Sequence, residues 1–196
     1  MSDRRQAADR RQAADAVQLL AISGSLRAVS TNTSVLRAMA CIAPPGVAIA
    51  PYDGLGDLPP FNPDLDVEGA TPPAIVRDLR TRIGRADGIV ISSPEYAHGI
   101  PGVLKNALDW LVSSLEFPGK PLALVNVSAR SVHARAQLTE ILTTMSARLI
   151  EPASVTLPLD GRRLDADAMC ADAEIARVLR AAIDTLVGAI TVPAQG

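Results

Sequence analysis

The chain has 196 residues, of which 48% are apolar, and a formal net charge of −2. This length and apolar content suit one compact domain, and the near-neutral charge lacks the basic surface that nucleic-acid binding requires. Its two cysteines, Cys41 and Cys170, lie far apart without metal-ligand spacing. They argue against a disulfide framework and a zinc site, so both are expected to be buried and no metal site is expected.

The N-terminal stretch repeats the hexamer DRRQAA twice over residues 3–14. It is charged and offers no apolar stripe to bury, so we expect residues 1–16 to form a flexible leader before a single domain at 17–192. A basic interaction arm is the alternative, which the interleaved aspartates disfavour. No segment approaches the roughly 18 apolar residues of a transmembrane helix, and no apolar core of a signal peptide is present. The expected location is therefore cytoplasmic.

From residue 17 onward, short apolar runs alternate with longer helical patterns. Such alternation predicts an α/β fold with parallel strands joined by crossover helices. The five expected strands are VQLLAIS (17–23), VAIAPY (47–52), GIVISS (88–93), LALVNVS (122–128) and ASVTLPL (153–159). The expected helices span 33–43, 71–86, 101–115, 133–149 and about 166–190. The Pro/Gly/Asp-rich segment 53–73 is expected to be a long surface loop.

The loop after the first expected strand, SGSLRAVSTNTS (23–34), runs directly into a helix. Free amides at a helix N-terminus, hydroxyls and one arginine, Arg27, together favour an anion site, although an ordinary capped turn is the alternative. The loop has one glycine and no lysine, which excludes the dinucleotide fingerprint and the NTPase phosphate loop. The pattern suits a terminal phosphate, such as that of FMN, better than a bridging pyrophosphate.

The loops after the third and fourth strands are the other candidates, because ligands in open α/β sheets bind beyond the carboxyl ends of strands. In SSPEYAHGIPGVLKNALDWL (92–111), prolines and glycine predict a rigid turn whose free amides could bind the edge of a planar ring. A plain strand-to-helix connection with a surface Tyr96 is the alternative. His98 has no acidic partner at useful spacing and is expected to be merely solvated. The Ser128 hydroxyl could reach a ring carbonyl, or it could only hydrogen-bond to the neighbouring backbone.

Two motifs, GSLRxxSxN (24–32) and SPEYxxxxPGVLKNALDW (93–110), resemble the NAD(P)H-dependent FMN reductase family, which includes quinone, azo-dye and chromate reductases. The stretch GKPLALV (119–125) also fits, and the similarity covers about residues 17–150. The resemblance implies a flavodoxin-like three-layer sandwich with a five-stranded parallel sheet in the order 2-1-3-4-5. It also implies non-covalent FMN and NADPH or NADH as the electron donor.

Carried over by position, the resemblance implies a binding site for the FMN phosphate, a loop that binds the isoalloxazine ring and a contact at the far edge of that ring. The phosphate would be held by Ser25, Arg27, Ser30, Thr31 and Asn32. The isoalloxazine would lie against Pro94, Glu95, Tyr96 and Ala97, mainly through backbone groups, with Ser128 at the far edge. Two departures stand out, since relatives commonly have Asn in place of Ala97 and a Gly-rich run in place of the sequence SARSVHARA (128–136). The second departure leaves open which acceptor is preferred and whether the nicotinamide contact is kept.

The resemblance predicts ping-pong electron transfer through FMN from NAD(P)H to a flavin, quinone or similar small-molecule acceptor. No side chain is assigned as a catalyst, because hydride transfer needs no protein acid or base. A flavodoxin-type electron carrier or flavin-binding sensor is the alternative, and an FMN-free scaffold is a third. A homodimer or homotetramer is expected, in which a neighbour's loop 53–70 could cover the acceptor pocket. The stripe that could join the copies, or simply pack in the core, is Val103, Leu104, Leu108, Leu111 and Leu115.

Overall fold

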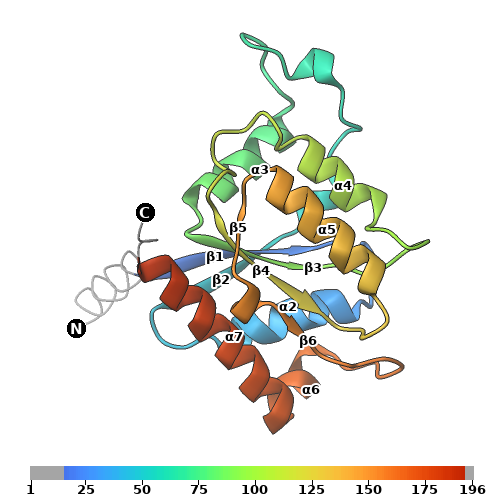
Figure 1. Cartoon of the computed structure of the whole chain (residues 1–196), viewed down its shortest axis with the longest axis vertical. Coiled ribbons are helices and arrows are strands. Elements are labelled where there is room, and N and C mark those ends of the chain that lie inside the picture. The colour runs from blue at the N-terminus through green and yellow to red at the C-terminus, as the bar shows by residue number, and fades with distance from the viewer. Residues whose placement is uncertain (1–15, 193–196) are drawn as a thin grey trace, which may run out of the picture.

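The computed structural model describes residues 16–192, as helices packed on both faces of one sheet (Figure 1). The strands are β1 (Val17–Ser23), β2 (Val47–Tyr52), β3 (Gly88–Ser92), β4 (Pro121–Asn126), β5 (Arg148–Leu149) and β6 (Val155–Thr156). The α-helices are α2 (Thr31–Ile42), α3 (Ala74–Arg85), α4 (Gly102–Asp109), α5 (Val132–Thr144), α6 (Ala166–Ala171) and α7 (Ala173–Thr191). Residues 1–15, most of the expected leader, lie outside this range. No helix within it is both long and apolar enough to cross a membrane.

The sheet is parallel and has the strand order β2-β1-β3-β4-β5, with β6 pairing off this path against β4. The flavodoxin-like fold and the predicted order are therefore confirmed. Strand β1 lies between β2 and β3, pairing with β2 from Val17 opposite Val47 and with β3 from Leu19 opposite Gly88. The carboxyl ends of β1, β3 and β4 consequently lie side by side at one edge of the sheet.

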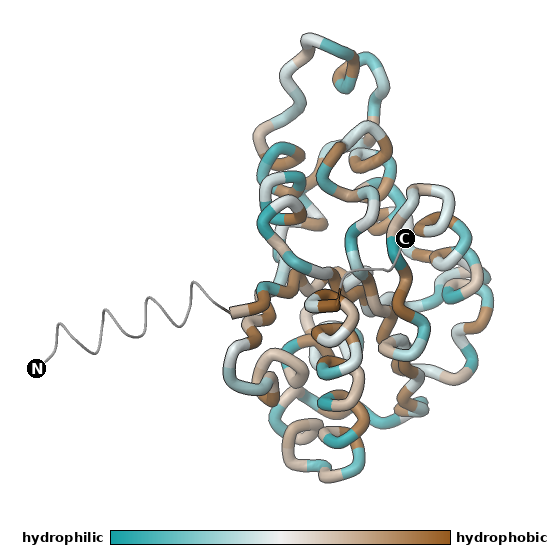
Figure 2. The backbone as a smooth tube through the Cα atoms, turned by 60° about the vertical axis from the view of Figure 1, so that its left-hand side comes forward, coloured by the Kyte–Doolittle hydropathy of each residue, from teal (hydrophilic) through white to brown (hydrophobic). Residues whose placement is uncertain are grey.

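Successive residues of β1 pack alternately into two separate hydrophobic cores, one on each face of the sheet. Leu20 and Ile22 of β1 pack in a cluster with α3, α4 and α5, whereas Leu19 and Ala21 pack in a cluster with α2, α6 and α7. Because both faces of the sheet are covered, apolar residues are favoured at successive strand positions, which explains the long apolar runs. The brown segments at the centre of the tube in Figure 2 correspond to these buried strands.

The fifth expected strand, at 153–159, is wrong in detail. The edge of the sheet is divided instead between β5, which lies inside the expected helix 133–149, and the equally short β6. A 3-10 turn over Glu151–Ala153 separates them, and its Pro152 cannot donate a ladder hydrogen bond. Helix α5 ends earlier than expected, at Thr144, and Ser146 then adopts a φ of 60° that turns the chain into β5.

Helix α4 is shorter than the predicted 101–115 and ends at Asp109. The Trp110 carbonyl accepts a hydrogen bond from Arg80 Nε at 3.1 Å, so a side chain replaces a helical amide there. Trp110 itself is fully buried and its Nε1 donates to the Pro59 carbonyl at 2.8 Å. Leu115 lies beyond the helix and is 93% exposed, while most of the predicted stripe is in the core: Leu104, Leu108 and Leu111.

The predicted surface loop 53–73 is anchored at its middle. It contains two 3-10 turns, Gly54–Asp57 and Pro63–Leu65, and projects at the top of Figure 1. Both carboxylate oxygens of Asp66 accept from Arg80 Nη2, at 2.9 and 2.8 Å, in an ion pair that is largely buried. The loop is therefore held against α3 by a specific contact.

The expectation that both cysteines are buried is wrong. Cys41 is exposed on α2, because the buried face of that helix is formed by other positions, and Cys170 on α6 is only partly buried. Desolvation raises the pKa of the Cys170 thiol to about 11, so it is protonated at neutral pH.

Candidate functional site

The three candidate loops meet at the carboxyl ends of β1, β3 and β4. The Gly24 amide donates to the Ser92 carbonyl at 2.8 Å, which joins the first loop to the end of β3. A Cβ atom at position 24 would lie 2.7 Å from Ser93 Oγ, so only glycine allows this approach. The contact brings the two sequence motifs, which are far apart in the chain, into one wall.

The first loop presents hydroxyls and free amides at the start of α2. Ser30 is the N-cap and accepts from the Thr33 amide at 3.3 Å, while Ser23 Oγ and Thr33 Oγ1 are 2.9 Å apart. Within residues 16–192, the amides of Thr31 and Asn32 have no hydrogen-bond acceptor. The first turn of α2 carries no acidic residue. These features leave a helix N-terminus ready to bind an anion.

Arg27 supplies the positive charge of this end. Its side chain is exposed, and among the described residues its guanidinium makes no hydrogen bond or ion pair. Its backbone amide donates to Ser25 Oγ at 3.4 Å, which ties the loop to a serine that is 8% exposed. An arginine without a partner beside free helix amides can bind a phosphate through two hydrogen bonds.

The Asn32 side chain takes part in a hydrogen bond within the protein, which its position in the sequence did not indicate. Its side chain is 7% exposed, and its Oδ1 accepts from the fully buried Ser92 hydroxyl at 2.9 Å. The side chain therefore ties α2 to β3, and the backbone amide is the part of Asn32 that is available to a ligand.

The loop after β3 forms a tight turn whose ends pair with each other. The Tyr96 amide donates to the Gly99 carbonyl at 2.9 Å, and the Gly99 amide returns a bond to Tyr96 at 3.0 Å. Both intervening residues have left-handed backbone, with φ of 49° at Ala97 and 59° at His98. Asn tolerates this conformation better than Ala. Alanine at position 97 is therefore under backbone strain that an asparagine would reduce.

Glu95 has a specific structural contact. Its Oε2 accepts from the Ala134 amide at 2.9 Å, so it caps α5 in place of Ser131, whose side chain makes no cap bond. This bond fastens the loop after β3 to the helix after β4. Glu95 lines a hollow of about 500 Å³ beside the main cleft, and Ala97 lines neither cavity.

Ser128 is held by a partner that the sequence did not indicate. Its Oγ donates to Asp160 Oδ1 at 2.6 Å, and Arg130 Nη2 donates to the same oxygen at 3.1 Å. The Ser128 hydrogen bond, with help from Arg130, lowers the pKa of Asp160 below its ordinary value. Asp160 is thus ionised at neutral pH and neutralises Arg130.

A cleft of about 890 Å³ joins these parts. Eight of the ten predicted site residues line it: Ser25, Arg27, Ser30, Thr31, Asn32, Pro94, Tyr96 and Ser128. The sequence reasoning missed one wall, the segment 159–165 that follows β6. This segment adds Arg163, which has no ion-pair partner among residues 16–192, and Arg162, which lies 3.3 Å from Asp172. The adjacent arginines Arg162 and Arg163 were the signal in the sequence that could have indicated it.

The two ends of the cleft differ in chemistry. One end offers a cation, hydroxyls and free amides, which suits a phosphate, and the walls further along include the apolar Val127 and Leu159. Tyr96 is an aromatic side chain on this wall that is 51% exposed. The volume of the cleft lies within the range of about 300–1,000 Å³ typical of cofactor sites.

Three comparisons place these residues among known proteins. The sequence profile described as NADPH-dependent FMN reductase matches residues 17–161. An NAD(P)H-dependent FMN reductase of Pseudomonas aeruginosa is 41% identical over 124 residues, which are 62% of this chain and 65% of that protein. A quinone reductase of Escherichia coli is 37% identical over 140 residues, which are 68% of this chain and 73% of that protein. The chain thus spans about two thirds to three quarters of the length of these relatives.

Solved structures agree on the fold. The flavoenzyme NAD(P)H:(acceptor) oxidoreductase FerB from Paracoccus denitrificans matches with a TM-score of 0.69 and 24% identity. The match covers 87% of this chain and 97% of that one. At this identity the likeness concerns the fold alone, and it extends beyond the region matched by the sequence profile.

Proposed function

The chain belongs to the NADPH-dependent FMN reductase family, as its two loop motifs indicated, and from this we propose that it is an oxidoreductase that uses NADPH or NADH to reduce a quinone, a free flavin or a similar small molecule. The observation that carries the proposal is the cleft at the carboxyl edge of the sheet. There the two motifs converge, and Arg27, which has no side-chain partner among residues 16–192, lies beside the N-terminus of α2.

The protein's part in the reaction is to bind and orient. Bound FMN would supply the redox chemistry between the nicotinamide and the acceptor. Arg27 and the amides of Thr31 and Asn32 would hold the phosphate, and the rigid turn at Tyr96–Gly99 would present backbone groups to the ring. No side chain needs to move a proton for hydride transfer, so none is assigned as a catalyst.

Ser128 has a positioning role in this proposal. Its hydroxyl hydrogen is committed to the Asp160 carboxylate, and its oxygen accepts from the Arg130 amide at 3.2 Å. The Ser128 oxygen is therefore fixed at the rim of the cleft, and it would reach the far edge of the ring as an acceptor or through a backbone neighbour. This arrangement would orient the ring through a fixed hydrogen-bonding group and not through a charged one.

A simple experiment tests the activity. The purified, FMN-loaded protein is mixed anaerobically with NADPH and, separately, with NADH, and the visible absorbance of the flavin is followed. We expect at least one nicotinamide to bleach the flavin, and a quinone added afterwards to restore the colour. Protein that stays oxidised with both donors, yet is bleached by dithionite, would be an electron carrier or a sensor, and the proposal would be wrong.

The electron-carrier alternative is motivated by one observation. The loop after β4 carries Arg130 and His133 where relatives have a Gly-rich run, and the Arg130–Asp160 ion pair crosses the rim of the cleft. Bulk at this rim would hinder the stacking of a nicotinamide. Steady-state turnover of NAD(P)H with a quinone separates the two functions, because a carrier would show none.

We also propose that the chain forms a homodimer or homotetramer in the cytoplasm, where its nicotinamide donors are found. Val112 and Leu115, just beyond α4, are 67% and 93% exposed, and a contact between copies would remove their apolar surface from water. Light scattering should give at least twice the monomer mass of 20.5 kDa. A mass of 20.5 kDa would contradict this assembly without touching the proposed chemistry.

A further inference from the structure

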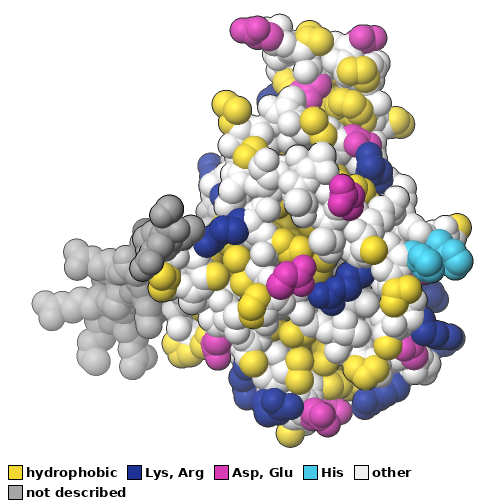
Figure 3. Space-filling view, in the orientation of Figure 1, with side chains coloured by type: hydrophobic (Ala, Val, Ile, Leu, Met, Phe, Trp, Pro, Cys, Tyr) yellow, Lys and Arg dark blue, Asp and Glu magenta, His cyan; other side chains and the backbone are white. Residues whose placement is uncertain are grey.

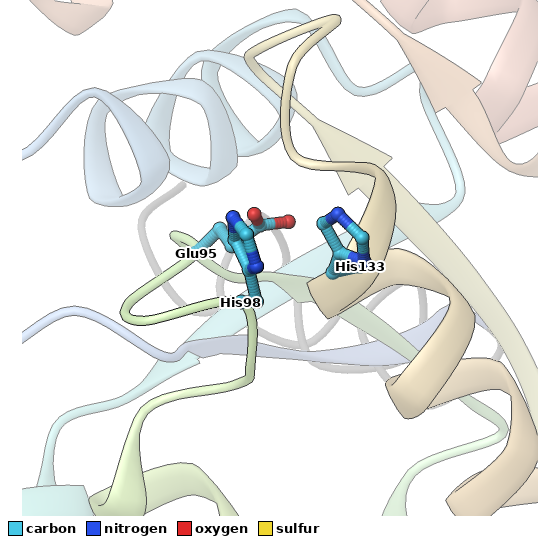
Figure 4. Close-up of side chains that lie close together, drawn as sticks. All are labelled: Glu95, His98 and His133. Carbon is cyan, nitrogen blue, oxygen red and sulfur yellow. The ribbon is translucent and has the colours of Figure 1, made fainter.

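The only two histidines of the chain lie against each other. The His98 and His133 rings are stacked with their centroids 4.2 Å apart and an angle of 22° between their planes. His98 belongs to the tight turn after β3 and His133 to the first turn of α5, so the contact joins two loops of the sheet edge (Figure 4). Both are exposed and form the single cyan patch in Figure 3.

A third side chain completes the cluster. Glu95, His98 and His133 each offer one ligand atom, and these atoms all lie within 4.8 Å of one another. Figure 4 shows the ends of the three side chains facing one another. Two imidazole nitrogens and one carboxylate oxygen suit a borderline divalent ion such as Zn²⁺, whereas Mg²⁺ and Ca²⁺ prefer oxygen ligands alone.

Two of the three ligands are already held in place. The Glu95 carboxylate is oriented by the bond from the Ala134 amide to Oε2, a support of the kind that metal-binding carboxylates have. His98 sits on the hydrogen-bonded turn between Tyr96 and Gly99, in left-handed backbone that faces it towards α5. The position of the Glu95 carboxylate and the backbone of His98 are therefore fixed, and only the imidazole rings have to adjust.

The remaining adjustment is small. Ligand atoms around a tetrahedral Zn²⁺ lie roughly 3.3 Å apart, given metal–nitrogen distances of about 2.0–2.1 Å. Closing the cluster from within 4.8 Å requires only that the two imidazole rings tilt out of their stack. Because both rings are exposed, that rotation displaces no packed neighbour.

We propose that Glu95, His98 and His133 form a binding site for Zn²⁺ or a similar divalent transition-metal ion, with a fourth position open to water. A bound ion would tie the loop after β3 to the start of α5, next to the hollow that Glu95 and His98 share with Pro94 and Ser128 of the main cleft. The inference rests on donor set and geometry, and it stands whether or not the chain reduces quinones.

Calorimetry with ZnCl₂ tests the site in the untagged, full-length, FMN-loaded protein after treatment with a chelator. We expect one saturable site per chain, and an affinity at least about tenfold lower in His98→Ala and in His133→Ala. Glu95→Gln should also weaken binding, since its amide oxygen can still cap α5 but carries no charge. No saturable binding in the unchanged chain would overturn the proposal.

The cysteines provide the matched control, because Cys41 and Cys170 are free and thiolates are strong Zn²⁺ ligands. The double variant Cys41→Ser/Cys170→Ser should bind Zn²⁺ as tightly as the unchanged protein. If it loses the ion while His98→Ala keeps it, zinc binds at the thiols and the assignment is wrong.

Proton NMR gives a readout that needs no variant. With only two histidines, the spectrum contains two imidazole Cε1–H signals, and both should shift together and saturate at one equivalent of Zn²⁺. Signals that stay in place while zinc binds elsewhere would contradict the site.

Discussion

The two ends of the cleft hold the same kinds of residue and use them in opposite ways. At the start of α2, serines accompany Arg27, whose guanidinium has no partner among residues 16–192. At the rim after β4, Ser128 accompanies Arg130, whose guanidinium lies 3.1 Å from the Asp160 carboxylate. The first end keeps its positive charge available, and the second cancels it within the protein.

The difference shows how the fold separates charge recognition from shape recognition. A phosphate needs an unpaired cation and free amides, which only the first end supplies. A neutral ring edge needs fixed donors and acceptors, and the second end fixes Ser128 through Asp160 and Glu95 through the Ala134 amide. Unsatisfied polar groups therefore mark the end that we propose for the phosphate, and satisfied ones mark the end that we propose for the ring, below called the phosphate end and the ring end.

The largest test removes the unpaired cation. Arg27→Ala should weaken FMN binding by roughly 1.5–3 kcal/mol, or about 10- to 150-fold in Kd, because a charged hydrogen bond to the phosphate is lost. Arg130→Ala is the matched control and should change the Kd much less, since that charge is already neutralised. Fluorescence titration of the apoprotein with FMN measures both, and equal losses would break the comparison.

The next test concerns the bond that joins the first loop to β3. Ser92→Ala leaves Asn32 Oδ1 buried without a donor, so the free energy of unfolding should fall by about 1–3 kcal/mol. Ser34→Ala, on the same helix but without a side-chain hydrogen bond among the described residues, should change it by less than about 0.5 kcal/mol. Urea denaturation distinguishes them. Equal stabilities would show that this bond does not fix the phosphate end.

A smaller effect, an increase in stability, is expected at the turn after β3, at the ring end of the cleft. Ala97→Gly should raise the free energy of unfolding by up to about 1 kcal/mol, because glycine removes the strain of a φ of 49°. Ala136→Gly, in the interior of α5, should lower it by about 1 kcal/mol. Opposite signs in thermal unfolding support a strained, fixed turn, and a loss at both positions would argue against it.

The smallest test follows the Asp160 carboxyl group by NMR titration. Its pKa should lie below the ordinary value, since the Ser128 hydroxyl and Arg130 stabilise the charged form, and Ser128→Ala should raise it again. A lowered folded pKa means that Asp160 adds stability above the ordinary aspartate pKa, and that this stability is lost as the pH falls through the folded pKa. An ordinary pKa in the unchanged protein would mean that Arg130 is not neutralised.

The sequence alone determined the parts of the molecule that depend on neighbours in the chain. Unbroken apolar runs such as 88–93 predicted buried parallel strands, and the hydroxyls around Arg27 predicted an anion site, because a strand, its loop and the following helix are contiguous. Glycine at position 24 and the prolines near 94 fixed where these loops turn. The family and the fold followed from the two motifs and are confirmed by the comparisons.

Only the tertiary structure decided which distant residues meet. Asp160 reaches Ser128, Glu95 caps α5 and His98 stacks on His133 because parallel strand order places the ends of β3, β4 and β6 side by side. No local pattern carries that information, since each partner lies some thirty residues or more away. The division of the edge strand into β5 and β6 has the same origin, because both segments pair with β4 and neither is a complete strand by itself.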